Sequence, residues 1–231
     1  MSQILLDSCQ YLNHPQAQIH DPFRNRDPEE IISGSTPLSL VTTRVVIGMT
    51  GATGQLYGIR ALELLEEGDY ESHLILSNAS ELNIKQESEY EVSEVREMAD
   101  KVHNIKNIGA QTASGSFKTA GMLVTPCSMK TLSNIANAAS GDLITRSADV
   151  HLKERRPVVV MPREKPLNRI HLENMLKVTD AGGIIMPPFP SFYQKPDSID
   201  EMVTRTMARA LSQLGIEIEF DEWAGIGADV E

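Results

Sequence analysis

From Arg44 onward, short apolar runs alternate with longer segments of helical character. This alternation constrains the fold more than any other feature, because short runs that are apolar throughout are typical of parallel strands buried on both faces. The runs are RVVIGMT (44–50), SHLILS (72–77), MLVTP (122–126), PVVVMP (157–162) and GIIMPP (183–188). Strands that alternate with helices form a parallel sheet covered on both sides. The sequence therefore predicts a three-layer α/β fold with a doubly wound parallel sheet, Rossmann-like (flavodoxin-like).

Helices are predicted in the segments between these runs. In QLYGIRALELLEE (55–67), Leu56, Ile59 and Leu62 recur at helical spacing. The other predicted helices lie in the charged stretch 79–104, in a segment that begins within TPCSMKTLSN (125–134), and in 141–156, 168–183 and 198–215. QTASGSFKTAG (111–121) has the composition of a loop. The chain contains no internal repeat, so residues 44–231 are predicted to form one domain.

Residues 1–43 differ from the rest, since they are rich in Pro, Asn, Gln, Ser and Thr. They also hold acidic residues such as Asp21 and Glu29, whereas mitochondrial transit peptides are poor in acids. We therefore predict an N-terminal extension, either a surface tail or an arm that packs on a neighbouring subunit, rather than a targeting segment.

The charge of the chain limits its partners. The formal net charge is -11, so a nucleic-acid partner is not expected. The two cysteines, Cys9 and Cys127, are far apart in sequence and form no recognisable metal or redox pair, so no metal is expected. No apolar run approaches the length of about 20 residues that spans a membrane. A cytoplasmic protein is predicted.

Glycines follow the first predicted strand, where Gly48 is succeeded by Gly51-Ala52-Thr53-Gly54. Ligands of doubly wound sheets bind at the carboxyl ends of the strands, and glycines there let the backbone approach a ligand. Either the segment is a simple tight turn, or it presents the next helix N-terminus to an anion. The second predicted strand ends in Ser77, without the acid that binds the ribose of NAD. This favours flavin mononucleotide (FMN) or another single-phosphate ligand.

The segment TPCSMKT (125–131) follows the third predicted strand and permits three interpretations. Cys127 as a nucleophile lacks a nearby histidine, so a small buried residue is the better interpretation. A P-loop is excluded, because the glycines of that motif are absent. The remaining interpretation is that Ser128 caps a helix, whose first N–H groups with Lys130 and Thr131 hold a phosphate or a flavin edge.

Basic residues are concentrated between Arg146 and Arg169. This segment holds seven basic and three acidic residues. Arg146 and Lys153 are seven residues apart and share one helix face, which is either a solvated surface or part of a site. Arg163 and Glu164 directly follow the fourth predicted strand. We expect both basic stretches at one sheet edge, where they bind a strongly anionic substrate, with Glu164 as a proton carrier.

The loop after the fifth predicted strand contains Phe189, Phe192 and Tyr193. Two interpretations remain open: the aromatic residues belong to the core, or Tyr193 donates its hydroxyl to an anion. Arg209, on the last predicted helix, forms a surface salt bridge or contributes to the site.

Several long segments together resemble the UbiX/Pad family of flavin prenyltransferases, over about Arg44 to Gly215. They are MTGATGQLYGIRALELL, ASGSFKTAGMLVTPCSMKTLSNIA, DLITRSADVHLKERRPVVVMPREKPLNRIHLENML and AGGIIMPPFPSFYQKP. The resemblance implies that residues 44–231 form an FMN-binding flavoprotein domain. It implies transfer of a dimethylallyl group from dimethylallyl phosphate to N5 and C6 of reduced FMN. The product, prenylated FMN, then serves a UbiD-type aromatic or acrylic acid decarboxylase.

The resemblance also implies site residues. The implied flavin contacts are Gly51, Ala52, Thr53, Ser77, Ser128, Met129, Lys130, Thr131 and Arg163. The implied substrate contacts are Tyr193, Arg209, Lys153 and Arg146, and the implied catalytic residues are Glu164, Lys153, Arg146 and Thr53. A homo-oligomer, by resemblance a dodecamer with sites between subunits, is implied as well.

The chain departs from the family pattern at two positions. It has Thr53 where many members have serine, which keeps the hydroxyl. It has Ile108 and Gly109 where many bacterial members have a tryptophan, and Trp223 is a candidate to cover the site instead. Two alternative functions remain: an FMN-dependent decarboxylase that acts directly on a small acid, and a non-catalytic flavin carrier. The sequence leaves open whether the prenyl donor is the monophosphate or the diphosphate.

Overall fold

The computed structural model describes residues 42–68, 70–193 and 195–218, within a compact unit that extends from Thr42 to Glu231. The predicted extension 1–43 lies outside the described residues apart from its last two, and Trp223 lies outside them as well. The N-terminal extension and the cover by Trp223 therefore stay predictions. No helix in the described part of the chain is both long and apolar enough to cross a membrane.

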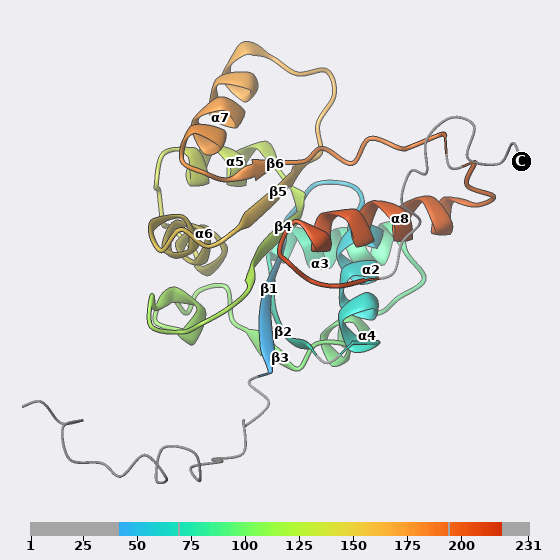
Figure 1. The fold of residues 1–231 in the computed structure, drawn as a ribbon, viewed down its shortest axis with the longest axis horizontal. Coiled ribbons are helices and arrows are strands. Elements are labelled where there is room, and N and C mark those ends of the chain that lie inside the picture. Colours follow the sequence, from blue (N-terminus) through green and yellow to red (C-terminus); the bar gives the residue numbers. More distant parts are fainter. Residues whose placement is uncertain (1–41, 69, 194, 219–231) are drawn as a thin grey trace, which may run out of the picture. The chain divides into compact units, whose positions relative to one another are not determined.

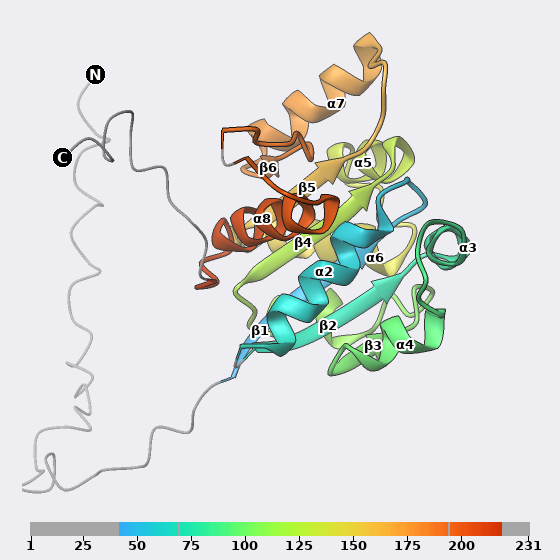
Figure 2. The same ribbon diagram turned by 90° about the vertical axis from the view of Figure 1, so that its right-hand side faces the viewer.

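A six-stranded parallel sheet forms the centre of this unit (Figure 2). Its strands are β1 (Thr43–Met49), β2 (Tyr70–Leu76), β3 (Lys101–His103), β4 (Gly121–Cys127), β5 (Val158–Pro162) and β6 (Ile184–Ile185). The strand order is β3-β2-β1-β4-β5-β6, which is the Rossmann order. The order reverses between β1 and β4, so the ligand crevice is expected at the carboxyl ends of these two strands. The predicted fold class is confirmed.

The stretch 79–104, predicted as helical throughout, is divided into three elements: α3 (Asn78–Glu87), α4 (Val92–Glu97) and β3. The prediction of five strands was therefore wrong by one. β3 has only three residues, Lys-Val-His, and none of them is buried. It is a strand because it pairs with β2, from His73 opposite Lys101 to Ile75 opposite His103. Such a short polar segment has no periodicity that identifies it beforehand.

Helices cover both faces of the sheet (Figure 1). One face carries α2 (Gln55–Glu66), α3, α4 and α8 (Ile199–Ser212), and the other carries α5 (Met129–Ala136), α6 (Leu143–Lys153) and α7 (Arg169–Asp180). β1 shows the cause of the two layers. Its residues Val45, Ile47 and Met49 belong to one buried cluster, whereas Val46 belongs to the other, because successive side chains of a strand point to opposite faces.

Side-chain caps begin most of these helices. The capping residues Ser77, Ser128, Asp142, Asn168 and Ser198 each accept a hydrogen bond from the N–H three residues along. α2 differs, because its N-cap is Gly54, which has φ 101° and no side chain to cap the helix. A residue with a Cβ is strained at this φ. The first N–H groups of α2 must therefore find their partners elsewhere in the molecule.

Candidate functional site

The segments that follow β1, β2, β4 and β5 meet at the carboxyl ends of the strands. We call these residues the strand-end site: Thr50–Gly54, Ser77, Ser128–Thr131 and Arg163–Glu164. Backbone hydrogen bonds connect the ends of neighbouring strands. Ser77 N donates to Met49 O at 3.0 Å, and Arg163 N donates to Cys127 O at 3.0 Å. All flavin contacts implied by the resemblance lie within this one edge of a single chain.

Thr50 joins the glycine loop after β1 to the end of β4, a role that no sequence pattern indicates. Its hydroxyl donates to Pro126 O at 2.8 Å and accepts from Ser128 N at 2.7 Å. Its backbone N–H also donates to Pro126 O, at 3.2 Å. The side chain is buried, with 2% exposed. Thr50 therefore determines the spacing between the two segments on either side of the topological switch.

A buried amide, Gln55, supports the glycine loop from beneath. Its Nε2 donates to Thr50 O at 2.9 Å and to Ala52 O at 2.7 Å, and its Oε1 accepts from Ser80 Oγ at 2.6 Å. Gly51 cannot be replaced by a residue with a side chain, since a Cβ there would lie 2.4 Å from Cβ of Ala79. The first turns of α2 and α3 thus hold the loop Gly51–Gly54 in one conformation.

Two N–H groups at the start of α2, those of Gly54 and Gln55, are bonded within the protein and are not offered to an anion, contrary to one interpretation of the sequence. Glu87, in the last turn of α3, places Oε2 at 2.7 Å from Gly54 N and 3.1 Å from Gln55 N. Its carboxylate is the negative group that this helix N-terminus favours. The sequence offered no signal for the contact, because Glu87 is one of several acids in the charged stretch 79–104 and lies 33 residues from Gly54.

The predicted cap of the helix after β4 is confirmed. Ser128 caps α5 and accepts from Thr131 N at 3.3 Å, and its hydroxyl donates to Thr131 Oγ1 at 3.2 Å. Lys130 is exposed in the first turn of the helix. Cys127 is fully buried, and burial raises the pKa of its thiol. The interpretation of Cys127 as a small buried residue is therefore confirmed.

Arg163 and Glu164 follow β5, adjacent to the α5 start. Burial raises the pKa of the Tyr57 phenol, whereas the nearby charge of Arg163 lowers it. The positive charge of Arg163 therefore acts on the first turn of α2, on the other side of the strand-end site. Glu164 is exposed, and its Oε1 accepts from Lys165 N at 3.0 Å.

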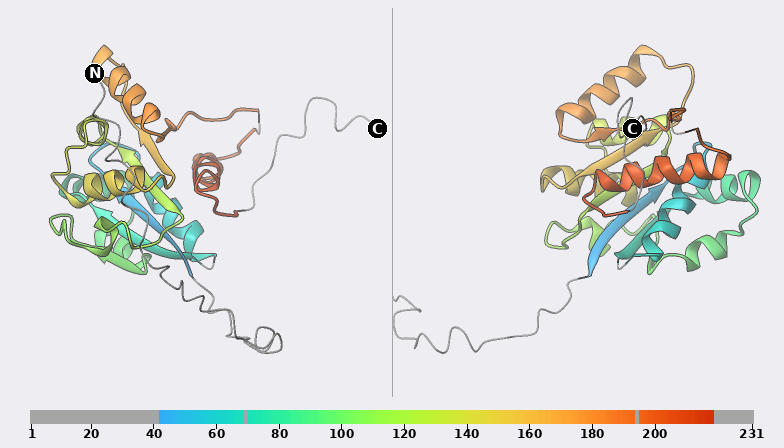
Figure 3. Two further views of the ribbon diagram at one scale, coloured as in Figure 1. Left: turned by 60° about the vertical axis from the view of Figure 1, so that its left-hand side comes forward. Right: turned by 45° about the vertical axis from the view of Figure 1, so that its right-hand side comes forward.

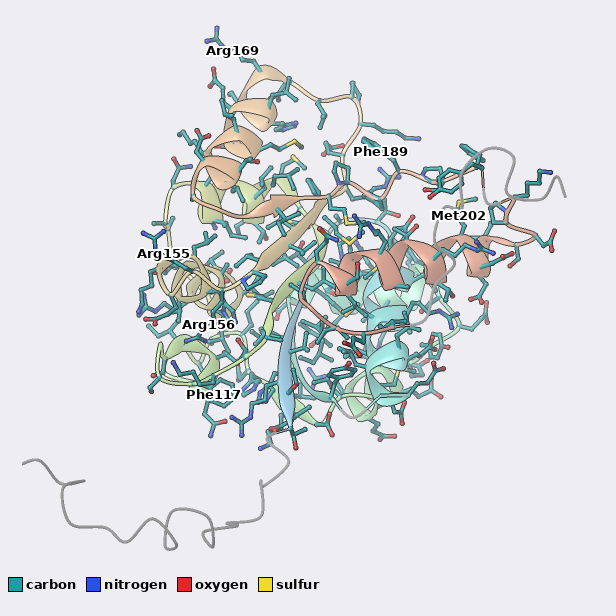
Figure 4. The ribbon with its side chains drawn as sticks, viewed as in Figure 1. Phe117, Arg155, Arg156, Arg169, Phe189 and Met202 are labelled. Carbon is teal, nitrogen blue, oxygen red and sulfur yellow. The ribbon has the colours of Figure 1, made fainter. Side chains whose placement is uncertain are left out.

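The prediction that the basic residues lie together at the carboxyl ends of the strands was wrong for Lys153. α6 runs antiparallel to the strands, so Lys153 at its C-terminus lies next to the amino end of β5. β5 alone, at about 3.3 Å per residue, extends over roughly 15 Å. Figure 4 shows Arg155 and Arg156 near Phe117, far from Phe189 at the opposite edge. Arg156 donates to Phe117 O at 2.6 Å and also to Gly115 O. Lys153 is paired with Glu154.

Arg146 lies one turn into α6 and is paired with Asp149 at 2.9 Å. It shares an exposed helix face with Lys153, as the spacing predicts, and both side chains are partly exposed. Neither of them pairs with Glu164 in the described part of the chain. Lys153, near the amino ends of the strands, is therefore not assembled with Glu164, at the carboxyl ends, within one chain.

The segment between β6 and α8 extends away from the sheet (Figure 3). Phe189 is 75% exposed and Phe192 is 71% exposed, so the interpretation of these residues as core aromatics was wrong. Tyr193 is also exposed. Arg209 lies in the last turn of α8, where it donates to Ser212 Oγ at 3.3 Å, and it pairs with no acid among the described residues. The end of α8 is near the amino end of β4, since Leu214 lies against Gly121.

The hydrogen-bond donors of the strand-end site suit the phosphate and the ring of FMN. The α5 N-terminus, the hydroxyls of Ser128 and Thr131, and the Lys130 ammonium provide donors for a phosphate. The glycine loop packs against Ala79 at Gly51, and it presents the Thr53 hydroxyl as a further polar group for the flavin. No group of three or more His, Cys, Asp or Glu residues suited to a metal ion occurs among the described residues.

Buried histidines make the fold sensitive to acid. His151 has Nδ1 at 2.7 Å from Ser147 O and Nε2 at 2.7 Å from Thr119 Oγ1. Because a carbonyl only accepts, Nδ1 carries the proton and Nε2 accepts from the threonine. Burial lowers the pKa of His151 to about 4. Burial likewise lowers the pKa values of His73 and His103, whose rings are hydrogen-bonded at 2.8 Å.

We expect the free energy of unfolding to fall as the pH is lowered from about 6.5 towards 4, because the unfolded chain takes up protons that the buried rings cannot. His151 alone should account for about 3 kcal/mol at pH 4. In urea unfolding at several pH values, His151→Gln should show a shallower pH dependence than the parent chain. His171→Gln, outside the buried core on α7, is the control. Equal slopes for all three proteins would contradict the assignment.

Comparison with known proteins places the chain in a family. The Flavoprotein family model matches residues 33–211, and so begins ahead of Arg44. A flavin prenyltransferase UbiX of Neisseria meningitidis is 50% identical over 184 residues, which cover 79% of this chain and 97% of that protein. The UbiX of Escherichia coli strain K12 is 42% identical over 186 residues, or 79% and 98% of the two chains.

Solved structures agree with these relatives. A crystal structure of AnUbiX in complex with FMN and dimethylallyl pyrophosphate has a TM-score of 0.76 and 46% identity, and covers 79% of this chain and 99% of that one. A dodecameric FMN-dependent UbiX-like decarboxylase from Escherichia coli O157:H7 has a TM-score of 0.77 and 43% identity, over 79% and 100% of the two chains. The predicted resemblance is confirmed: the chain belongs to the flavoprotein family and, within it, to the UbiX flavin prenyltransferases.

Proposed function

We propose that this chain is a flavin prenyltransferase that transfers a dimethylallyl group from dimethylallyl phosphate to N5 and C6 of reduced FMN. The observation that carries the proposal is the strand-end site, where the glycine loop, Ser77, the α5 start and Arg163 occupy one sheet edge. It is supported by the AnUbiX complex, which holds FMN and the prenyl pyrophosphate together. The product is proposed to serve a UbiD-type decarboxylase.

Each group of residues has a proposed role. Ser77, Lys130, the α5 N-terminus and the hydroxyls of Ser128 and Thr131 bind the flavin, through its phosphate or the edge of its ring. Gly51, Ala52 and Thr53 contact the ring, with Met129 and Arg163 at its side. Bound reduced flavin supplies the nucleophilic ring atoms and a π surface that stabilises an allylic cation.

The donor phosphate leaves as an anion, and positive side chains stabilise the charge that develops on it. Lys153, Arg146 and Arg209 are the proposed cations, and Tyr193 donates its hydroxyl to the same group. Glu164 lies beside Arg163, and we assign it the transfer of a proton between the phosphate and the flavin site. Thr53 keeps the hydroxyl found at this position in many members of the family.

The site is proposed to be assembled from several subunits. Lys153 and Arg209 lie towards the amino ends of the strands, whereas Arg163 and Glu164 lie at the carboxyl ends. A phosphate a few ångströms across cannot contact both sets within one chain. Copies arranged as in the dodecameric relative would bring the two sets together. The exposed Phe189, Phe192 and Tyr193 are suited to the same contact between copies.

Direct decarboxylation of a small acid is the second candidate function. It is favoured by the name of the Escherichia coli O157:H7 relative, an FMN-dependent UbiX-like decarboxylase. The cysteine-decarboxylating flavoprotein TvaF shares the fold but is only 14% identical. A non-catalytic flavin carrier would not need Lys153, Glu164, Tyr193 and Arg209 to be retained together, and all four are present.

An anaerobic reaction tests the proposal. The full-length protein is mixed with reduced FMN and dimethylallyl phosphate, and in parallel with the diphosphate, and the released flavin is analysed by mass spectrometry. The expected result is a flavin heavier by one C5H8 unit with at least one donor, which also resolves the donor. Unchanged flavin with both donors, from a protein that binds FMN, would reject prenyl transfer and favour the carrier or the decarboxylase.

A further inference from the structure

A loop outside the strand-end site packs directly against Lys153. This 114–118 loop, Ser114–Lys118, leads from the short 3-10 turn Gln111–Ala113 towards β4, at the amino ends of the strands. A Cβ on Gly115 would lie 2.9 Å from Lys153 Nζ and would overlap the Glu154 carboxylate. The ion pair of Lys153 and Glu154 therefore rests on the backbone of Gly115, and the position of the loop limits where the Lys153 ammonium can lie.

Arg156 holds this loop by two of its backbone carbonyls. Its Nη1 donates to Phe117 O at 2.6 Å and its Nη2 donates to Gly115 O (Figure 4). The planar guanidinium presents two donors in a fixed fork, which an ammonium group cannot reproduce. The side chain is only partly exposed. Arg156 therefore fixes the loop at the residue against which Lys153 packs.

The backbone at the end of α6 directs Arg156 towards the loop. Arg155 N donates to Leu152 O at 3.0 Å and Arg156 N donates to His151 O at 2.9 Å, which is the Schellman arrangement of a helix end. This arrangement places Arg155 at φ 56°, where glycine is usual. Lys153 is the last residue of α6. The same helix end thus carries both the residue that holds the loop and the residue that packs on it.

Other contacts anchor the loop independently of Arg156. Thr119 Oγ1 lies 2.7 Å from His151 Nε2, just beyond the loop. The Phe117 ring packs edge-on against the ring of His73, with 5.0 Å between the centroids. The loss of the Arg156 guanidinium should therefore loosen the backbone next to Lys153 without unfolding the protein.

We propose that Arg156 is a positioning residue of the transferase reaction, which keeps the 114–118 loop against Lys153 and so determines where the Lys153 ammonium meets the donor phosphate. The inference rests on the proposed role of Lys153 as a donor contact. Arg156 acts through the loop, since both of its Nη groups are bonded to carbonyls. Without it, the long Lys153 side chain has more freedom, and the donor must order this side chain when it binds.

Steady-state kinetics of prenylated FMN formation, with the prenyl donor and reduced FMN varied in turn, test this role. Arg156→Met keeps an unbranched side chain but removes both hydrogen-bond donors. The KM for the prenyl donor should rise roughly tenfold. The KM for FMN should change by less than about twofold, because the flavin contacts lie at the carboxyl ends of the strands. Arg155→Met removes the same charge from the exposed neighbouring residue and should leave both KM values unchanged. Arg156→Lys, which keeps the charge but not the fork, should give an intermediate donor KM.

Gly115→Ala tests the same contact from the side of the loop. Its methyl group would displace the flexible ends of Lys153 and Glu154, while Arg156 still holds the loop carbonyls. The donor KM should rise again, with little change in thermal stability. Gly141→Ala is the matched control, since a Cβ there has no neighbour within 4 Å. This pair of variants decides the question even if Arg156→Met does not fold.

Three results would contradict the inference. They are an unchanged donor KM in Arg156→Met and Gly115→Ala, an equal rise in Arg155→Met, and an Arg156→Lys protein that matches the parent chain. Equal weakening of the prenyl donor and FMN in Arg156→Met would mean that Arg156 only supports the fold. A parent chain that binds FMN but forms no prenylated FMN with either donor would overturn the proposed function, and this inference with it.

Discussion

Two inactive variants should restore each other's activity when they are combined in one oligomer. Lys153→Ala and Glu164→Gln are each expected to lower prenyl transfer by roughly 10²- to 10³-fold, since each removes a charge or a proton carrier at the reacting phosphate. Because Lys153 lies near the amino ends of the strands and Glu164 at the carboxyl ends, a shared site must take the two residues from different copies of the chain. Randomly mixed oligomers then contain both native residues in about a quarter of their sites.

The measurement is the rate of prenylated FMN formation by co-expressed chains that carry two different tags and are purified through both. The control mixes Glu164→Gln with Arg163→Ala. These residues are neighbours on one chain, so each site receives both from the same copy and mixing should restore nothing. Recovery in the control, or a mixed Lys153→Ala and Glu164→Gln oligomer as inactive as its parents, would show that the site is not shared in this way.

The second large effect is expected from a single hydroxyl. Thr50→Val keeps the shape of the side chain but removes the bond to Ser128 N, which then lies partly buried without its partner. The loss of such a partner costs about 1–3 kcal/mol. FMN should also bind roughly tenfold more weakly, because the α5 start is no longer held at a constant distance from the glycine loop.

Urea unfolding and FMN titration check this expectation. Thr179→Val is the control, since the Thr179 hydroxyl lies on α7 and donates only to Met175 O within its own helix. It should change the free energy of unfolding by less than about 0.5 kcal/mol. If Thr50→Val matches that control in both stability and FMN affinity, the bridge between β1 and β4 does not organise the site.

The strand-end residues were predictable from sequence because their positions follow from the fold. Once the apolar runs at 44–50, 122–126 and 157–162 are taken as parallel strands, the segments after them must meet at one edge. Ser128 was identifiable as a cap, since a serine before a helical segment accepts a backbone N–H. Burial of Cys127 followed from its place at the end of a strand.

Contacts between residues distant in the chain were not predictable in this way. Glu87 reaches Gly54 across 33 residues, and Thr50 reaches Ser128 across 78. Glutamate on a helix and threonine after a strand are common, so neither residue type is a signal by itself. β3 was missed for the same reason, because its three residues become a strand only by pairing with β2.

The sequence by itself determined the parallel sheet, the two helical layers and the set of segments at the carboxyl ends of the strands. These follow from local periodicity and from the rule that side chains alternate along a strand. Only the tertiary structure decided that Lys153 and Glu164 are separated, that Phe189 and Phe192 are exposed, and that Glu87 occupies the α2 start. The physical reason is that the direction of α6 and the packing of α3 on the glycine loop depend on contacts between distant segments, which no local pattern of residues records.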